Sequence, residues 1–203
     1  MNSKPRNVSR STTSANPNQS FTAFRRACLW SLALVAAGAL ASFKCVAAER
    51  GADLAKPIRI NAGATASYTD PAGNTWLPDQ GFDGGKTVDR GKLEIAGTTV
   101  PDIYRTEHYA MKAFAQAVPN GAYTVKLHFA ETFAKNTAKG QRVFSVKVED
   151  QEIKDLDVVA KAGAPKTAWV ETLNVNVSDG KLDITFTPGV QSTEINGIEI
   201  LPR

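Results

Sequence analysis

The most constraining feature of the sequence is the alternation of apolar and polar residues after residue 56. Across residues 123–129 every odd position is apolar, while the even positions hold Thr124, Lys126 and His128. A period of two places successive side chains on opposite faces of a β-strand, so each run predicts a half-buried strand. The remaining alternating runs occupy residues 144–149, 173–177, 182–187 and 198–200. Neither a convincing amphipathic helix nor an internal repeat competes with them, and the pattern predicts an all-β, antiparallel sandwich.

Turn-forming residues separate the predicted strands. Asn-Gly and Asp-Gly pairs suit the positive φ angles of tight hairpins, so we expect a hairpin at each such site. The predicted turns are Pro119-Asn120-Gly121, Asp150-Gln151 and Ser178-Asp179-Gly180. The strands that they would join span residues 113–118 and 122–129, 142–149 and 152–159, and 169–177 and 181–187. Residues 109–118 have a composition that also permits a helix, and we predict a strand for the second half.

The positive charge and the cysteines lie only in the first 48 residues. The chain carries a net charge of +4, but residues 1–48 hold six basic and no acidic residues, and the rest holds 18 basic and 20 acidic residues. The sequence beyond residue 48 therefore gives no electrostatic argument for a nucleic-acid partner. Both cysteines, Cys28 and Cys45, also lie before residue 48, so the sequence beyond that residue can form neither a disulfide nor a thiolate metal site. With only two histidines in the chain, we expect neither a metal nor a cofactor.

Residues 25–48 have the pattern of a secretory signal peptide. Two arginines precede an uncharged run at 27–43, and Val46-Ala47-Ala48 place small residues before a cut at Glu49. An uncleaved membrane anchor is the alternative, because the run is almost long enough to span a bilayer. We predict an exported protein, periplasmic or extracellular, without a membrane span if the signal is cleaved. Its parts are a disordered extension (1–24), the signal peptide (25–48), a short linker (49–56) and a β-sandwich domain (57–203).

Enzyme motifs are absent from the sequence, which holds no Gly-x-Ser-x-Gly elbow, phosphate-binding loop or paired-histidine zinc helix. Glu107 and Glu131 are candidates for the carboxylate pair of a glycoside hydrolase, although structural roles are the simpler interpretation. His128 is interpreted as a hydrogen-bonding residue of its strand. We therefore predict a protein that is not an enzyme and has no catalytic residues.

Two aromatic residues in or beside loops suggest a binding role. Trp76 lies among turn formers at residues 70–79, and Phe133 follows the strand that ends near Glu131. A rigid aromatic ring can pack against the apolar face of a sugar while neighbouring polar groups bind its hydroxyls. The alternative for Trp76 is that its ring folds under its own loop as a minor core.

Seven blocks, in order, resemble the malectin domain family. The match that they define spans about residues 57–202, and the blocks are 58–63 (IRINAG), 76–79 (WLPD), 103–109 (IYRTEHY), 121–131 (GAYTVKLHFAE), 140–146 (GQRVFSV), 154–157 (KDLD) and 195–200 (INGIEI). The resemblance, which is to bacterial-type members, implies a jelly-roll-like β-sandwich that binds carbohydrate through loop aromatics and a carboxylate at one end of the sandwich.

The same resemblance implies the site residues. Trp76 and Phe133 stand where the family has stacking aromatics, whereas Ala134 replaces a second ring. Arg90 stands in place of a tyrosine, and Gln191 in place of an acidic residue. We therefore expect a non-catalytic protein that binds a glycan, glucose-containing or another di- or oligosaccharide, by stacking on Trp76 and Phe133. Arg90 and Gln191 would bind hydroxyl groups, and Arg90 could instead favour an acidic sugar.

Two further functions stay open. An envelope scaffold or adhesion module that binds a protein partner would present a large apolar patch outside the loop cleft. A glycoside hydrolase, which we favour less, would need two carboxylates facing each other in that cleft.

Overall fold

The computed structural model describes residues 56–203 of the chain. The predicted disordered extension, the signal peptide and nearly all of the predicted linker lie outside the described residues. No helix within the described range is long and apolar enough to cross a membrane.

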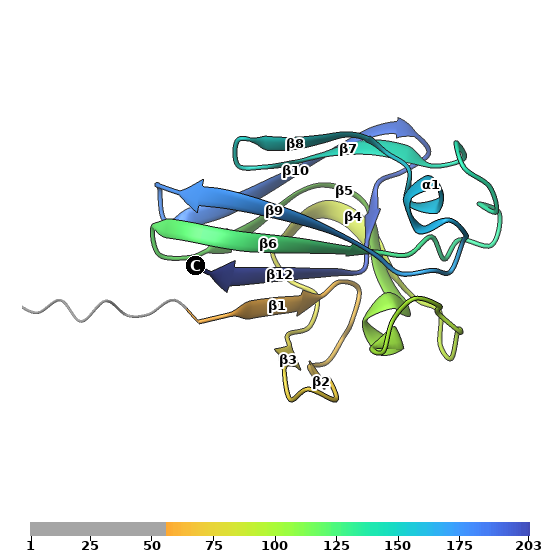
Figure 1. The fold of residues 1–203 in the computed structure, drawn as a ribbon, viewed down its shortest axis with the longest axis horizontal. Coiled ribbons are helices and arrows are strands. Elements are labelled where there is room, and N and C mark those ends of the chain that lie inside the picture. Colours follow the sequence, from red (N-terminus) through yellow and green to blue (C-terminus); the bar gives the residue numbers. More distant parts are fainter. Residues whose placement is uncertain (1–55) are drawn as a thin grey trace, which may run out of the picture. The chain divides into compact units, whose positions relative to one another are not determined.

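Two antiparallel sheets make up the domain (Figure 1). The smaller sheet has four strands in the order β1 (Ile58–Asn61), β12 (Gly197–Pro202), β6 (Gly121–Phe129) and β9 (Trp169–Val177). The larger sheet has the order β11 (Glu194–Ile195), β5 (Thr106–Ala117), β10 (Lys181–Val190), β7 (Val143–Val148) and β8 (Gln151–Leu156), and β4 (Phe82–Asp89) also pairs with β5. A two-stranded ribbon pairs β2 (Tyr68–Thr69) with β3 (Thr75–Trp76). These pairings confirm the predicted antiparallel, all-β fold.

The main core lies between the two sheets and follows the period-two pattern. Val125, Leu127 and Phe129 of β6 are fully buried, as are Val146 and Val148 of β7. Each such side chain contributes about 1.5–3 kcal/mol relative to an exposed one, before the conformational entropy of folding is subtracted. Alternation in the sequence therefore identified the faces on which the sheets meet.

Two of the three predicted hairpins are wrong. β5 pairs with β4, β10 and β11, whereas β6 pairs with β9 and β12, so the turn at Asn120-Gly121 crosses from one sheet to the other. The turn at Asp179-Gly180 likewise joins β9 of one sheet to β10 of the other. The two turns bind each other, because Asn120 donates to the Ser178 carbonyl (2.9 Å) and accepts from the Gly180 amide (2.7 Å). The hairpin at Asp150-Gln151 is confirmed, since β7 pairs with β8.

Short helices appear where the sequence had suggested strand or loop. A 3-10 helix, η1, spans Pro101–Tyr104, and an α-helix, α1, spans Val158–Ala162. The predicted strand at 152–159 ends at Leu156 because Asp157 caps α1, its carboxylate accepting from the Ala160 amide at 3.0 Å. The ambiguous residues 109–118 lie almost entirely in strand β5, so the prediction for their second half is confirmed.

Candidate functional site

A hollow of about 300 Å³ lies where the larger sheet meets the loops that follow β4, β6 and β10. Its volume is at the lower end of the range typical of small-molecule pockets, about 300–1,000 Å³. Three of the four residues proposed from the sequence line it together, Arg90, Phe133 and Gln191. The other lining residues are Val88, Glu107, Tyr109, Arg142 and Ser192. We call this space the first hollow.

Trp76 is not at this hollow, and its predicted stacking role is wrong. The residue is only 2% exposed and packs with Ile103 and Tyr104 in a separate minor core. Its indole N–H donates to the Asp70 carboxylate at 3.1 Å, and its ring meets the His128 ring edge-on at 5.3 Å. Because these contacts cover the ring, it offers no face to a ligand, and the alternative of a minor core under the loop is the correct one.

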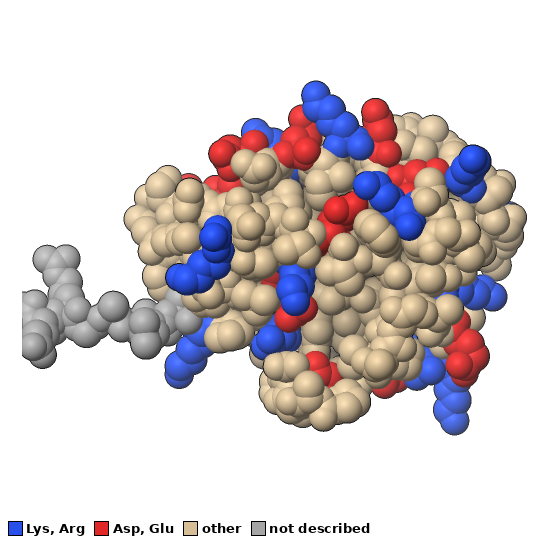
Figure 2. All heavy atoms as spheres, viewed as in Figure 1, with Lys and Arg blue, Asp and Glu red and all other residues tan. Residues whose placement is uncertain are grey.

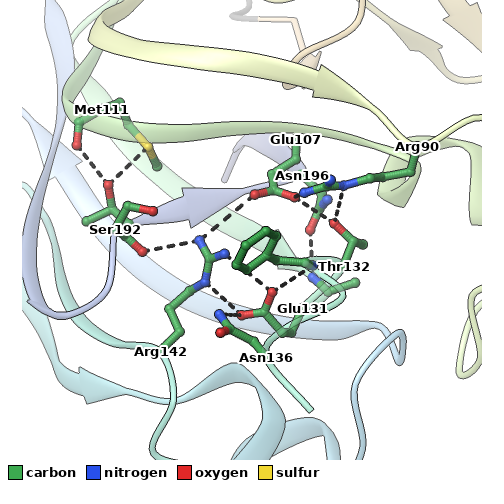
Figure 3. A network of polar contacts seen from close by, with 12 residues as sticks. Arg90, Glu107, Met111, Glu131, Thr132, Asn136, Arg142, Ser192 and Asn196 are labelled. Carbon is green, nitrogen blue, oxygen red and sulfur yellow. Dashed lines mark hydrogen bonds and ion pairs between the residues drawn. The ribbon is translucent and has the colours of Figure 1, made fainter.

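Arg142 is the centre of the network beneath the first hollow (Figure 3). Its Nε donates to Glu131 Oε2 at 2.7 Å, and its Nη1 lies 3.9 Å from Glu107 Oε1 and 3.2 Å from the Ser192 carbonyl. A single buried guanidinium thereby ties β5 to the loop after β6 and to the loop after β10. The planar donor fork of arginine suits such multiple contacts.

Arg90 extends the network on the β4 side. Its Nη2 lies 3.1 Å from Glu107 Oε2, and its Nε donates to the Thr132 hydroxyl at 3.1 Å. That hydroxyl donates to Glu107 Oε2 at 2.6 Å. Guanidinium and carboxylate groups therefore alternate from Arg90 through Glu107 and Arg142 to Glu131 (Figure 3). Because each buried charge has an opposite charge beside it, the groups compensate one another within the protein.

Glu131 also sets the backbone that carries Phe133. Its carboxylate accepts from the Phe133 amide at 2.9 Å and from the Asn136 side-chain amide at 3.0 Å. The loop after β6 is therefore closed around a buried carboxylate, which fixes where the partly exposed Phe133 lies. Glu131 itself lines a different hollow from Glu107, and each is paired with an arginine. This is not the arrangement of two carboxyl groups across one sugar that glycoside hydrolysis requires.

Glu194, in β11, is the one described residue whose buried side-chain oxygens lack hydrogen-bond partners. It is completely buried, and neither carboxylate oxygen has a hydrogen-bond partner among the described residues. Burial raises the pKa of Glu194 well above its usual value, and the charges of Glu107 and Glu131 raise it further, against an opposing effect of Arg142. The fold therefore favours the neutral form of the Glu194 carboxyl more strongly than water does.

Both histidines are held by hydrogen bonds. His108 Nδ1 forms a hydrogen bond with Asp79 at 2.9 Å, and its Nε2 forms one with the Gly84 carbonyl at 2.9 Å. Burial alone would lower the pKa of His108, but these two contacts outweigh burial, so the pKa is raised. His128 bonds to the Tyr104 hydroxyl at 2.8 Å and to Glu199 at 3.1 Å, as the hydrogen-bonding interpretation predicted. No group of three potential metal ligands is found within residues 56–203.

Sequence reasoning missed four lining residues, Val88, Tyr109, Arg142 and Ser192. Tyr109 was hidden because Ala110 has a φ of 57° and interrupts the alternation of β5, its amide donating to the Thr193 carbonyl. Arg142 carries a signal that could have been read, since a charged residue at the start of an apolar strand must find a partner if it is buried. Nothing in the local sequence indicates Ser192.

Comparison with known proteins identifies the family of this sandwich. The malectin domain model matches residues 56–199. Among curated proteins, the rice (Oryza sativa subsp. japonica) kinesin-like protein KIN-14E is 28% identical over 153 residues, which are 71% of this chain and 14% of that protein. Receptor-like protein 4 of Arabidopsis thaliana is 37% identical over 84 residues, 40% of this chain and 13% of that protein. The chain thus spans about one-seventh of the length of these relatives.

Solved structures share the fold at low sequence identity. A β-glucuronidase of Bacteroides uniformis aligns with a TM-score of 0.66 and 22% identity, over 73% of this chain and 18% of that chain. The extracellular domain of ANXUR2 from Arabidopsis thaliana aligns with a TM-score of 0.62 and 18% identity, over 73% of this chain and 49% of that chain. These likenesses show the fold, and the family model covers almost all of the described residues. The chain belongs to the malectin domain family.

Proposed function

We propose that this chain is an exported, non-catalytic carbohydrate-binding protein and that a di- or oligosaccharide binds in the first hollow. Membership of the malectin domain family supports a non-catalytic binding role. The observation that carries the proposal is the pairing of two partly exposed aromatic side chains, Tyr109 and Phe133, with polar groups around one hollow. Export is supported by the signal-peptide pattern of residues 25–48.

The lining of the first hollow suits a hydroxylated ligand with apolar faces. Tyr109 is partly exposed and Gln191 is exposed, and both line the hollow, so the hydroxyl of one and the side-chain amide of the other can meet sugar hydroxyls. Phe133 and Tyr109 offer apolar surface for ring faces. Each hydrogen bond in such an open site contributes about 1 kcal/mol net, which predicts weak affinity, on the order of micromolar to millimolar.

The surface argues against the other partner classes. Acidic and basic side chains are interspersed on the face drawn in Figure 2, where a nucleic-acid-binding protein would show a continuous basic surface. Val170 and Val190 are the only large apolar residues exposed in the described part of the chain, and they lie on different sheets. The large apolar patch expected of a scaffold module is therefore not found in residues 56–203.

Phe133→Ala tests the proposed site. A glycan array followed by calorimetry should identify a ligand of the wild-type chain, and Phe133→Ala should weaken its binding at least tenfold because the apolar contact is lost. Phe133→Tyr keeps the ring and should retain binding within about threefold. Thermal unfolding must show that both variants are folded. Unchanged affinity in Phe133→Ala would place the ligand elsewhere, and binding to an envelope protein that no sugar competes would support the scaffold function instead.

A further inference from the structure

Phe133 also lines a second hollow, of about 210 Å³. The two hollows therefore adjoin at this one aromatic residue. Ala134 and Pro165 give the second hollow apolar surface, and Asn136, Thr137 and Lys166 give it polar groups. Alone it is smaller than a typical ligand pocket, but the two hollows together fall within the usual range of about 300–1,000 Å³. A ligand with two units fits this arrangement better than a single compact one.

The charges of the two hollows differ. In the first hollow the guanidinium groups of Arg90 and Arg142 are ion-paired with Glu107 and Glu131. In the second, Lys166 is exposed and has no ion pair among the described residues, and Glu131 is already bound by Arg142. Lys135, on the adjoining loop, is likewise exposed and without an ion pair in residues 56–203. Of these two lysines only Lys166 lines the second hollow, so Lys166, and not the paired Arg90, is the cation that faces a ligand there.

The backbone of Lys166 is held in place although its conformation is unfavourable. Its φ of 53° lies in the left-handed region that non-glycine residues seldom adopt. Its amide donates to the Glu131 carbonyl at 2.9 Å, and its carbonyl accepts from the Ala96 amide at 2.9 Å. Such conformations persist where the surroundings impose them, and they concentrate at binding sites. Gln191, which lines the first hollow, also has a left-handed backbone, with a φ of 66°.

We propose that the ligand is an acidic oligosaccharide that spans Phe133, with a neutral sugar in the first hollow and a hexuronic acid unit in the second. This rests on the proposed carbohydrate-binding function and adds the class of sugar and its orientation. The ring of Phe133 contacts both units. The uronate carboxylate pairs with the Lys166 ammonium, and the Thr137 hydroxyl bonds to a sugar hydroxyl. The paired arginines make the first hollow neutral, so it takes an uncharged unit.

Calorimetry with matched disaccharides tests the proposal on the full chain. The probes are maltose, cellobiose and laminaribiose, each beside its counterpart in which the non-reducing unit is oxidised at C6 to the uronic acid. At least one acidic form should bind about two- to fivefold more tightly than its neutral parent, the size expected of one partly exposed charge pair. The preference should shrink as salt rises from about 0.05 to 0.5 M.

Lys166→Met should abolish the preference, measured as the ratio of acidic to neutral affinity, because it keeps the side-chain length and removes the charge. Lys166→Arg should keep the preference, and Lys147→Met, on exposed β7 surface, serves as the charge-matched control. Equal binding of acidic and neutral probes to the wild type, or a preference that survives Lys166→Met, would overturn this inference and leave the proposed function standing. If the wild type binds no sugar at all, the proposed function itself is overturned.

Discussion

The buried carboxyl of Glu194 makes a prediction about pH. Because its pKa is raised in the fold, its contribution to stability is fully present below the unfolded pKa, about 4.3, and is lost as pH rises through the folded pKa. Glu194→Gln removes the titration, so at pH 7.5 its free energy of unfolding should exceed that of the wild type, by about 1.4 kcal/mol for each unit by which the fold raises the pKa of the carboxyl. At pH 4 the two proteins should be nearly equal.

Urea unfolding at several pH values measures this difference. Glu152→Gln, on exposed β8 surface, is the matched control and should show no pH-dependent gain. A Glu194→Gln variant that is less stable than the wild type at pH 7.5 would mean that the carboxylate has a partner after all.

Trp76 gives a second prediction at the residue scale. Trp76→Phe removes the indole N–H that binds Asp70 and shrinks the minor core, so stability should fall by about 1–3 kcal/mol. Glycan affinity should be unchanged because the ring lies away from the first hollow. Thermal unfolding beside calorimetry separates the two effects, and a loss of affinity in the folded variant would return Trp76 to the site.

Strand β4 carries the prediction at the scale of elements. Gly84 and Gly85 both have positive φ, 70° and 87°, but a Cβ on Gly85 would meet His108 Nε2 and the Tyr109 carbonyl at 2.6 Å, whereas one on Gly84 would meet nothing within 4 Å. Gly84→Ala should therefore cost only about 1 kcal/mol of backbone strain. Gly85→Ala should cost about 1–3 kcal/mol more and weaken glycan binding, because it pushes β4, which carries Val88 to the hollow, away from β5.

Chemical denaturation and calorimetry on this pair of variants check the role of β4. Equal stability of the two alanine variants would show that β4 shifts freely on β5. Full affinity in a destabilised Gly85→Ala would show that the position of β4 is not needed at the hollow.

For the whole molecule, the local sequence pattern predicted the fold class better than it predicted which strands pair in which sheet. The alternation at β6 and β7 marked the core faces because burial acts on each strand separately. The sheet to which a strand belongs depends on contacts between distant residues, so the turns at Asn120 and Asp179 were misread as hairpins. The same reason explains Trp76, whose cover includes His128, fifty-two positions away in sequence. Arg90, Phe133 and Gln191 came together as the family resemblance implied, whereas Arg142 needed the three-dimensional structure.

The network around Arg142 has a consequence for the energetics of recognition. Its guanidinium is already fixed by Glu131, Glu107 and the Ser192 carbonyl, so the floor of the first hollow is ordered before any ligand arrives. A sugar that binds there does not have to immobilise long, flexible side chains, a cost of about 0.5–1.5 kcal/mol for each one. Preorganisation of this kind would let a small, open hollow bind a ligand that offers only a few weak contacts.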